Sequence, residues 1–402
     1  MSNAKPQWLN RTVLGIGLSS LFADWSHEVA TALLPAFLGT MGVSAAWLGT
    51  IEGVADGLAS FTKMGSGYYT DKLQRRKPIA VLGYLITALG TASFAFATQA
   101  WHVLLGRSFA WFGRGVRSPV KKAILASAVT KETYGRAFGL ERMMDTIGAI
   151  VGPASAFFLF GALHHNYSTL FALTIIPGLI ATAIIAFMVK EKERLPVKYR
   201  SFREGLRALP KTFRRMLAGV GLFGFGAFAH SMLILLATQE LSPSLGTAGA
   251  ASVAIGLYIL HNVFYASFAL IGGILADRMP KHVLLAVGYS LAATMCVLII
   301  LLPPTVLTLA LVFILGGTNV ALEETLEGSL SAELVSEEHH GIAYGTLDTV
   351  NGIGDFASSI VVGALWSAFG VGIAFSYSAV LSIAGAVLIL FLRPSPHRPS
   401  RA

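Results

Sequence analysis

Apolar runs of about 20 residues recur along the whole chain, and they constrain the fold more than any other feature of the sequence. Each run is long enough to cross the roughly 30 Å hydrocarbon core of a bilayer as a helix. Of the 402 residues, 54% are hydrophobic and only 13% are charged. A soluble protein of this length needs more charge to cover its surface. The sequence therefore predicts an all-α polytopic membrane protein.

We predict twelve transmembrane helices. They lie at about 12–39, 45–70, 78–98, 101–128, 134–163, 168–189, 212–238, 249–276, 282–302, 305–332, 340–367 and 371–393. The charged stretch 190–211 contains Pro196 and separates six spans from six. This divides the chain into an N-terminal bundle (1–189), a linker (190–211) and a C-terminal bundle (212–402).

The Lys and Arg residues that give the chain a net charge of +9 lie on one side of this arrangement. The alternate connections contain no Lys or Arg; they are 41–45, 98–100, 164–168, 239–247, 303–305 and 368–371. This positive-inside pattern places both termini and the linker in the cytoplasm, and it makes a nucleic-acid partner unnecessary. The single cysteine, Cys296, excludes an intrachain disulfide and a cysteine-based metal cage.

An internal repeat relates the two halves. "GYYTDKLQRRK", which contains Asp71, resembles "GILADRMPKH", which contains Asp277, at an offset of 206. "GRAFG" at 135–139 resembles "GIAYG" at 341–345 at the same offset. Separate motifs that agree on one offset predict two pseudo-symmetric six-helix bundles.

The first span carries Asp24, His27 and Glu28 in its middle. Asp24 and Glu28 are one helical turn apart and share a face, whereas His27 lies about 100° around the helix. Because carboxylates in hydrocarbon are costly, we expect this face to line a water-filled cavity. Asp24 and Glu28 are the first candidates for proton coupling or cation binding.

The fourth span carries a stripe of cations on one face. Arg107, Arg114, Arg117 and Lys121 follow at spacings of 7, 3 and 4. Four cations cannot all face lipid, so we expect them to face a cavity or acidic partners. The three arginines are candidates for coupling or for binding an anionic substrate. The neighbouring Lys122 is expected to reach the cytoplasmic interface.

Two further motifs carry a family resemblance. Gly67, Asp71 and the basic pair Arg75 and Arg76 resemble the loop signature of the major facilitator superfamily, in which the aspartate complements a neighbouring helix N-terminus. In the fifth span, the triad of Gly148, Gly152 and Pro153 resembles the Gly-x-x-x-Gly-Pro motif of drug:proton antiporters.

Together with "DWSHE", "IEGVADGLASFTKMGSG" and "GRGVRSP", these motifs resemble a bacterial subgroup of that superfamily over essentially the whole chain. The resemblance implies a location in the bacterial cytoplasmic (inner) membrane. It also implies ion-coupled transport by alternating access, with spans 1, 4, 7 and 10 around a central cavity.

The repeat also predicts a cytoplasmic gate. The offset of 206 places Arg117 and Lys121 on Glu323 and Glu327, so cations in one half oppose anions in the other. We expect Arg117 and Lys121 to meet Glu323 and Glu327 when the cytoplasmic side closes. The alternative is that each stripe is neutralised within its own half, for example Arg117 by Asp71 or Glu141.

Other polar residues inside the spans are secondary candidates for binding or coupling. They are Glu52, Asp56, His230, His261 and Asn319.

The leading hypothesis is a secondary transporter that exports a small organic molecule in exchange for protons, as a monomer in the bilayer and without a cofactor. One alternative is a divalent-metal transporter, with ligands from Asp24, His27, Glu28, His230 and His261. Uptake of an organic anion is another. A membrane enzyme needs a nucleophile–base pair or a metal motif, and none stands out. A receptor or scaffold does not need charge on so many cavity faces.

Overall fold

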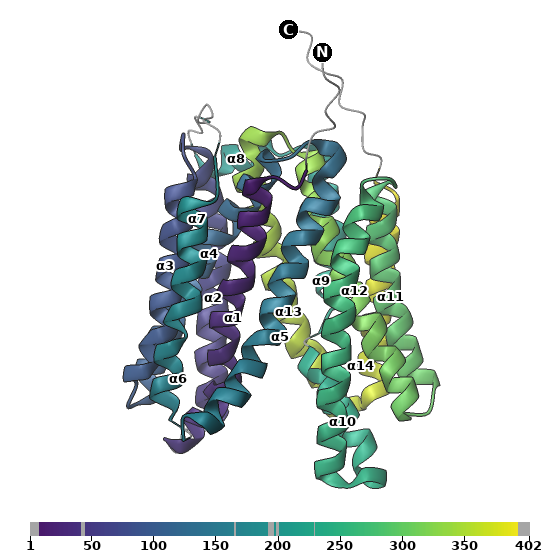
Figure 1. Cartoon of the computed structure of the whole chain (residues 1–402). Coiled ribbons are helices and arrows are strands. Elements are labelled where there is room, and N and C mark those ends of the chain that lie inside the picture. Colours follow the sequence, from purple (N-terminus) through teal and green to yellow (C-terminus); the bar gives the residue numbers. More distant parts are fainter. Residues whose placement is uncertain are drawn as a thin grey trace.

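The computed structural model describes residues 8–41, 45–164, 166–191, 197, 201–228 and 230–392. These residues form helices that run side by side in two groups (Figure 1). Eight of the described helical segments are long and apolar enough to cross a membrane by length and composition. The arrangement agrees with the predicted all-helical membrane protein.

The N-terminal half contains six spans. They are α1 (Arg11–Thr40), α2 (Ala45–Asp71), α3 (Lys77–Ala92), α4 (Ala100–Ser127), α5 (Tyr134–Ala162) and the consecutive pair α6 (Tyr167–Leu173) and α7 (Ile175–Phe187). The C-terminal half contains α9 (Lys211–Gly224), α10 (His230–Ala276), α11 (Lys281–Leu301), α12 (Val306–Leu334), α13 (His340–Phe369) and α14 (Val371–Leu390).

The seventh span differs from the single helix predicted at 212–238. It is divided between α9, which ends at Gly224, and the beginning of α10. Gly226, in the turn after α9, lies so close to α14 that a Cβ atom there would be 2.6 Å from the Cβ of Leu381. The predicted connection 239–247 is also helical as far as Gly246, where α10 bends. Gly246 has a φ of 71°, which glycine adopts without steric cost.

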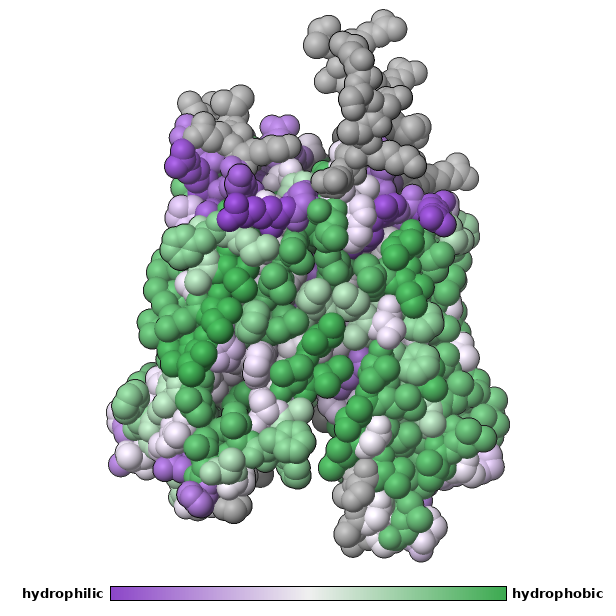
Figure 2. Space-filling view, in the orientation of Figure 1, coloured by the Kyte–Doolittle hydropathy of each residue, from purple (hydrophilic) through white to green (hydrophobic). Residues whose placement is uncertain are grey.

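The predicted linker contains a short helix, α8 (Phe202–Ala208). Ser201 caps it by accepting a hydrogen bond from the backbone N–H of Glu204 at 3.3 Å. The ring of Phe202 packs against Tyr68 of α2, with ring centroids 5.4 Å apart. We call the end of the bundle where α8 lies, α1 begins and α14 ends the linker end (Figure 1). Hydrophilic residues gather at this end, above a broad hydrophobic belt (Figure 2).

Glycines bring the two halves into backbone contact towards the linker end. A Cβ atom on Gly67 of α2 would lie 3.0 Å from the Cα of Gly345 on α13. A Cβ atom on Gly273 of α10 would lie 3.2 Å from the Cα of Gly139 on α5. These two crossings are related by the offset of 206, so the sequence repeat is also a repeat of packing. At the opposite end, the surface between the halves is hollowed into a cleft (Figure 2).

Candidate functional site

Asp24 is a buried acid in the middle of α1. Asp24 is 6% exposed, and its Oδ1 lies 3.7 Å from Nη2 of Arg114 on α4. No donor among the described residues makes a hydrogen bond to this Oδ1. The carboxylate is therefore held by charge attraction, and its Oδ1 is not committed to a hydrogen bond.

The glycine motif of α5 packs directly against the two acids of α1. A Cβ atom on Gly148 would lie 3.1 Å from the Cβ of Asp24, and one on Gly152 would lie 2.6 Å from the Cβ of Glu28. Pro153 follows within the same helix. Because glycine lacks a side chain, α5 approaches α1 closely at this depth and fixes the position of both acids. The Glu28 side chain is 27% exposed.

Trp111 of α4 is the centre of a second polar cluster. The ring of His27 lies 4.3 Å from its ring, and the guanidinium of Arg107 lies 3.7 Å from its ring centroid. The indole Nε1–H donates to Oδ1 of Asp56 at 2.6 Å. Arg107 also donates to Oγ1 of Thr31 at 3.2 Å. His27 therefore points at a neighbouring helix, as its place on the helical wheel predicts.

Lys121 is neutralised within its own half. Its Nζ lies 2.5 Å from Oε1 of Glu141 on α5 and 2.9 Å from Oγ of Ser20 on α1. The neighbouring Arg117 is 4% exposed, and its guanidinium lies 4.3 Å from the ring centroid of Tyr84 on α3. The prediction that Lys121 pairs with Glu323 and Glu327 across the bundle is therefore wrong for this conformation, because an acid on α5 is closer.

Glu327 is also satisfied without a cation. The hydroxyl of Tyr289 donates to its Oε1 at 2.6 Å, and Nδ2 of Asn351 donates to its Oε2 at 2.6 Å. The carboxylate is 2% exposed and bonded entirely within the C-terminal half. In this conformation Glu327 therefore does not pair with Lys121 as the predicted gate requires. Glu323 lines a cavity in the same half.

Other charges connect the two halves. Nε of Arg142 on α5 lies 2.7 Å from Oε2 of Glu324 on α12, and its Nη1 lies 2.8 Å from Oδ2 of Asp145 in its own half. Lys122 of α4 lies 2.5 Å from Oδ1 of Asp348 on α13. Lys122 was expected to reach the cytoplasmic interface of the membrane. Instead it forms an ion pair with Asp348 in the other half.

The loop aspartates complete the closure at the linker end. Asp71 accepts hydrogen bonds from the backbone N–H groups of Gly341 and Ile342, at 2.9 and 2.8 Å, where α13 begins. Arg76 also donates to Asp71 at 2.9 Å. Asp277 accepts in the same way from the first turn of α5. Each aspartate thus complements the N-terminus of a helix in the other half, the role expected of Asp71.

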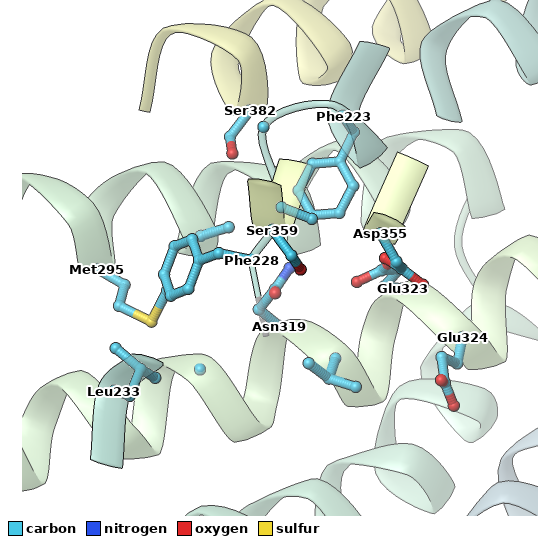
Figure 3. A pocket seen from close by; sticks show the side chains of 15 residues that line it. Phe223, Phe228, Leu233, Met295, Asn319, Glu323, Glu324, Asp355, Ser359 and Ser382 are labelled. Carbon is cyan, nitrogen blue, oxygen red and sulfur yellow. The ribbon is translucent and has the colours of Figure 1, made fainter. Parts of the chain in front are cut away.

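The C-terminal half encloses a cavity of about 280 Å³ (Figure 3). It is lined by residues of α9, α10, α11, α12, α13 and α14 and of the turn between α9 and α10. Its acidic and polar lining residues are Glu323, Glu324, Asp355, Asn319, Ser359 and Ser382, and its aromatic and sulfur-bearing ones are Phe223, Phe228 and Met295. No Lys, Arg or His is among the lining residues. The cavity thus combines anionic and apolar surfaces.

The remaining candidates fall in different places. His261 is 2% exposed, with its ring centroid 5.8 Å from that of Tyr258. Arg75 is exposed in the loop after α2. The side chains of Glu52 and His230 lie outside the described part of the structure. Within the described part, no group of three or more His, Cys, Asp or Glu residues is placed to hold a metal ion.

Arg142 and Asp145 are not among the predicted site residues, although the sequence carries a signal for them. With Glu141 they form a charged group at positions i, i+1 and i+4 of an otherwise apolar span. Charge inside a transmembrane helix was the signal that identified span 1, and it also applies to span 5.

Comparison with known proteins decides the family. The model of the Major Facilitator Superfamily matches residues 14–237 and 216–402. The chain belongs to the major facilitator superfamily. An uncharacterized MFS-type transporter of Methanocaldococcus jannaschii is 27% identical over 391 residues, 97% of each chain. The multidrug resistance protein MdtH of Salmonella arizonae is 25% identical over 203 residues, 50% of this chain and 48% of MdtH.

Solved structures of the superfamily share the fold. The human organic anion transporter MFSD10 (TETRAN) has a TM-score of 0.79 at 17% identity, covering 96% of this chain and 100% of its own. The transporter FucP in the outward conformation has a TM-score of 0.77 at 16% identity, with the same coverage. The predicted fold of twelve helices in two halves and the predicted membership of the superfamily are confirmed. This major facilitator protein is a transporter rather than an enzyme.

Proposed function

We propose that this transporter exports a small organic molecule in exchange for protons across the bacterial cytoplasmic membrane. The observation that carries the proposal is Asp24, a buried carboxylate in the membrane core whose Oδ1 accepts no hydrogen bond from the described residues. A carboxylate in that position gains most from either a cation or a proton. Arg114, 3.7 Å away, competes with the proton for it.

The orientation of the protein follows from the positive-inside rule. The linker end carries the basic connections, so it faces the cytoplasm together with both termini. The contacts of Asp71, Asp277, Arg142 and Lys122 hold the halves together at and below that end. The cleft at the opposite end therefore opens to the outside (Figure 2).

The charge network supports a coupling mechanism. A proton that enters through the cleft neutralises Asp24 or Glu28 and weakens the hold of α1 on Arg114 of α4. The same helix carries Lys122, and Lys122 closes the cytoplasmic side through Asp348. Arg142 connects Asp145, in the proton-binding half, with Glu324 in the wall of the C-terminal cavity. Protonation and substrate occupancy thus act on ion pairs that differ between the two access states.

Two observations favour export of an organic molecule over the other hypotheses. The glycine–proline motif of α5 packs against the acids of α1, and the relative MdtH, matched over half of this chain, is named a multidrug resistance protein. Arg107 and Arg117 contact the rings of Trp111 and Tyr84, so these two cations are already engaged by aromatic surface. Uptake of an organic anion receives less support from this arrangement.

Transport in proteoliposomes tests the proposal. An imposed proton gradient should drive movement of compounds from a panel of small organic molecules, and a protonophore should stop it. Asp24→Asn and Glu28→Gln should abolish gradient-driven transport while substrate exchange without a gradient persists, because exchange needs alternation but no net proton movement. Wild-type rates in both variants under a gradient would place the coupling elsewhere, with Asp56 as the next group to test.

A further inference from the structure

The membrane part of the C-terminal half is rich in acids and has no cations of its own. Residues 216–277 and 282–392 contain no Lys or Arg, although α12 and α13 carry carboxylates in the middle of their spans. A carboxylate buried in a membrane protein needs a cation, hydrogen-bond donors or a proton. For each of these carboxylates we therefore identify the cation or hydrogen-bond donor, where there is one, that stabilises its charge.

Most of these carboxylates have a partner. Glu324 and Asp348 receive a cation from the N-terminal half, and Glu327 receives two hydrogen bonds from its own half. Glu323 and Asp355 have no cation within ion-pair distance among the described residues. Both line the 280 Å³ cavity.

Asn319 gives an independent indication of a ligand-binding position. Its residue is 5% exposed and lines the same cavity, one turn before Glu323 on α12. Its Nδ2 donates to the backbone oxygen of Gly288 at 2.9 Å. Among the described residues, none donates a hydrogen bond to its Oδ1. An amide oxygen in a cavity wall that has no donor is a position for an N–H group of a ligand.

The rest of the lining is apolar. Figure 3 shows Glu323 and Asp355 on one side of the cavity and Phe228 and Met295 on the other, with Asn319 and Ser359 between them. Aromatic faces and thioether sulfur attract cations and apolar groups. The cavity has the volume of roughly nine water molecules at about 30 Å³ each. This is enough space for a small organic molecule and more than a bare ion needs.

We propose that this cavity binds a small organic ammonium ion. Its charge lies against Glu323 and Asp355, an N–H group donates to Oδ1 of Asn319, and its apolar body lies against Phe228 and Met295. The inference rests on the transport function proposed above, because it names the substrate class and the half that binds it. The proton site on α1 lies in the other half, so substrate and proton do not compete for one carboxylate.

Binding to the purified full-length protein tests this assignment. The probe is radiolabelled benzylamine at neutral pH, where it is present as the benzylammonium ion and carries N–H donors for Asn319. Ethylbenzene, its neutral isostere, is the competitor at equal free concentration. We expect the neutral compound to displace the probe about tenfold less well or worse, because a desolvated charge pair dominates recognition.

Variants locate the site. Glu323→Gln and Asp355→Asn should each weaken probe binding about tenfold or more, whereas Glu323→Asp, which keeps the charge, should retain most of it. Glu240→Gln is the matched control, because Glu240 is an exposed acid of the same half. Its affinity should stay within about twofold of wild type. Thermal unfolding of each variant reports whether it is folded.

Three results would overturn the proposal. They are equal displacement by the neutral isostere, wild-type affinity in both Glu323→Gln and Asp355→Asn, and no binding of the probe to the wild-type protein. In the last case the two carboxylates carry protons only. If the ammonium ion does not bind but a proton gradient still drives transport of other compounds, the binding assignment is wrong and the proposed function stands. If the ammonium ion binds but a proton gradient drives no transport, the binding assignment stands and the proposed function is wrong.

Discussion

The ion pair between Lys122 and Asp348 gives the most direct test of how the cytoplasmic side is closed. The two side chains come from α4 and α13, in different halves of the protein, and are 13% and 5% exposed. Nζ of Lys122 lies 2.5 Å from Oδ1 of Asp348, and Ser118 donates to its Oδ2 at 2.6 Å. The perturbation is charge reversal at each position, Lys122→Glu and Asp348→Lys, and then both together.

The magnitude follows from burial. Breaking a buried ion pair by changing one partner costs about 3–5 kcal/mol, because it leaves an uncompensated buried charge. In the inward-open state the halves separate and water solvates both groups, so the cost falls on the closed state. At about 1.4 kcal/mol per tenfold, a loss of about 3 kcal/mol moves the equilibrium roughly a hundredfold towards the inward-open state.

Spin labels on the two loops at the linker end measure this shift. Gln74→Cys and Arg278→Cys place labels on exposed loop positions in different halves. A Cys296→Ser background removes the native thiol, which is fully buried. We expect each single reversal to lengthen the main distance, and the double reversal to restore the wild-type distribution in large part. Lys131→Glu, the same charge change at an exposed lysine, is the control.

An unchanged distance distribution in both single variants would refute the reasoning, because the pair would then contribute nothing to closure. A double variant as open as the single ones would show that the effect comes from disrupted packing rather than from charge.

Three further predictions concern packing, buried polarity and topology. Gly148→Ala should lower the free energy of unfolding by about 1–3 kcal/mol in detergent. The added Cβ atom would lie 3.0 Å from the backbone nitrogen of Trp25 on α1. Gly161→Ala on the same helix meets nothing within 4 Å, and an equal loss there would contradict this account. Tyr289→Phe should cost about 1–3 kcal/mol, because it removes a donor from a buried carboxylate on α12; calorimetry that shows no change would contradict it. A cysteine at Ser201, at the start of α8, should react with a membrane-impermeant reagent only after cells are opened, whereas one at Ser244, exposed near the bend of α10, should react in intact cells. The reverse labelling would invert the topology.

Much of the fold could be predicted from sequence because hydrocarbon leaves few alternatives. An apolar run of about 20 residues satisfies its backbone only as a helix, so the runs themselves predict the spans. The repeat at offset 206 predicted two related halves, and the structure carries the same offset in the glycine contacts of Gly67 and Gly273. The broken seventh span escaped prediction, since the close approach of Gly226 to α14 depends on a helix more than 150 residues away.

The sequence predicted which charged residues belong to the candidate site, but it predicted their contact partners only in part. Charge in a membrane span marks a functional residue, which identified Asp24, Glu28 and the cations of α4. Sequence spacing gives the face of a helix but not the rotation of that helix against its neighbours. In the structure this rotation turns Lys121 towards Glu141 and Lys122, the next residue, towards Asp348.

The sequence by itself determined that this protein crosses a membrane in two related bundles, because the cost of exposing polar groups to hydrocarbon acts on each segment separately. Only the tertiary structure decided which charges meet. A step of one residue turns a side chain about 100° around a helix, and ion pairs form only over a few ångströms. The pairs that close the cytoplasmic side therefore come from the packing of the helices. So does the cavity in which Glu323 and Asp355 have no described cation within ion-pair distance.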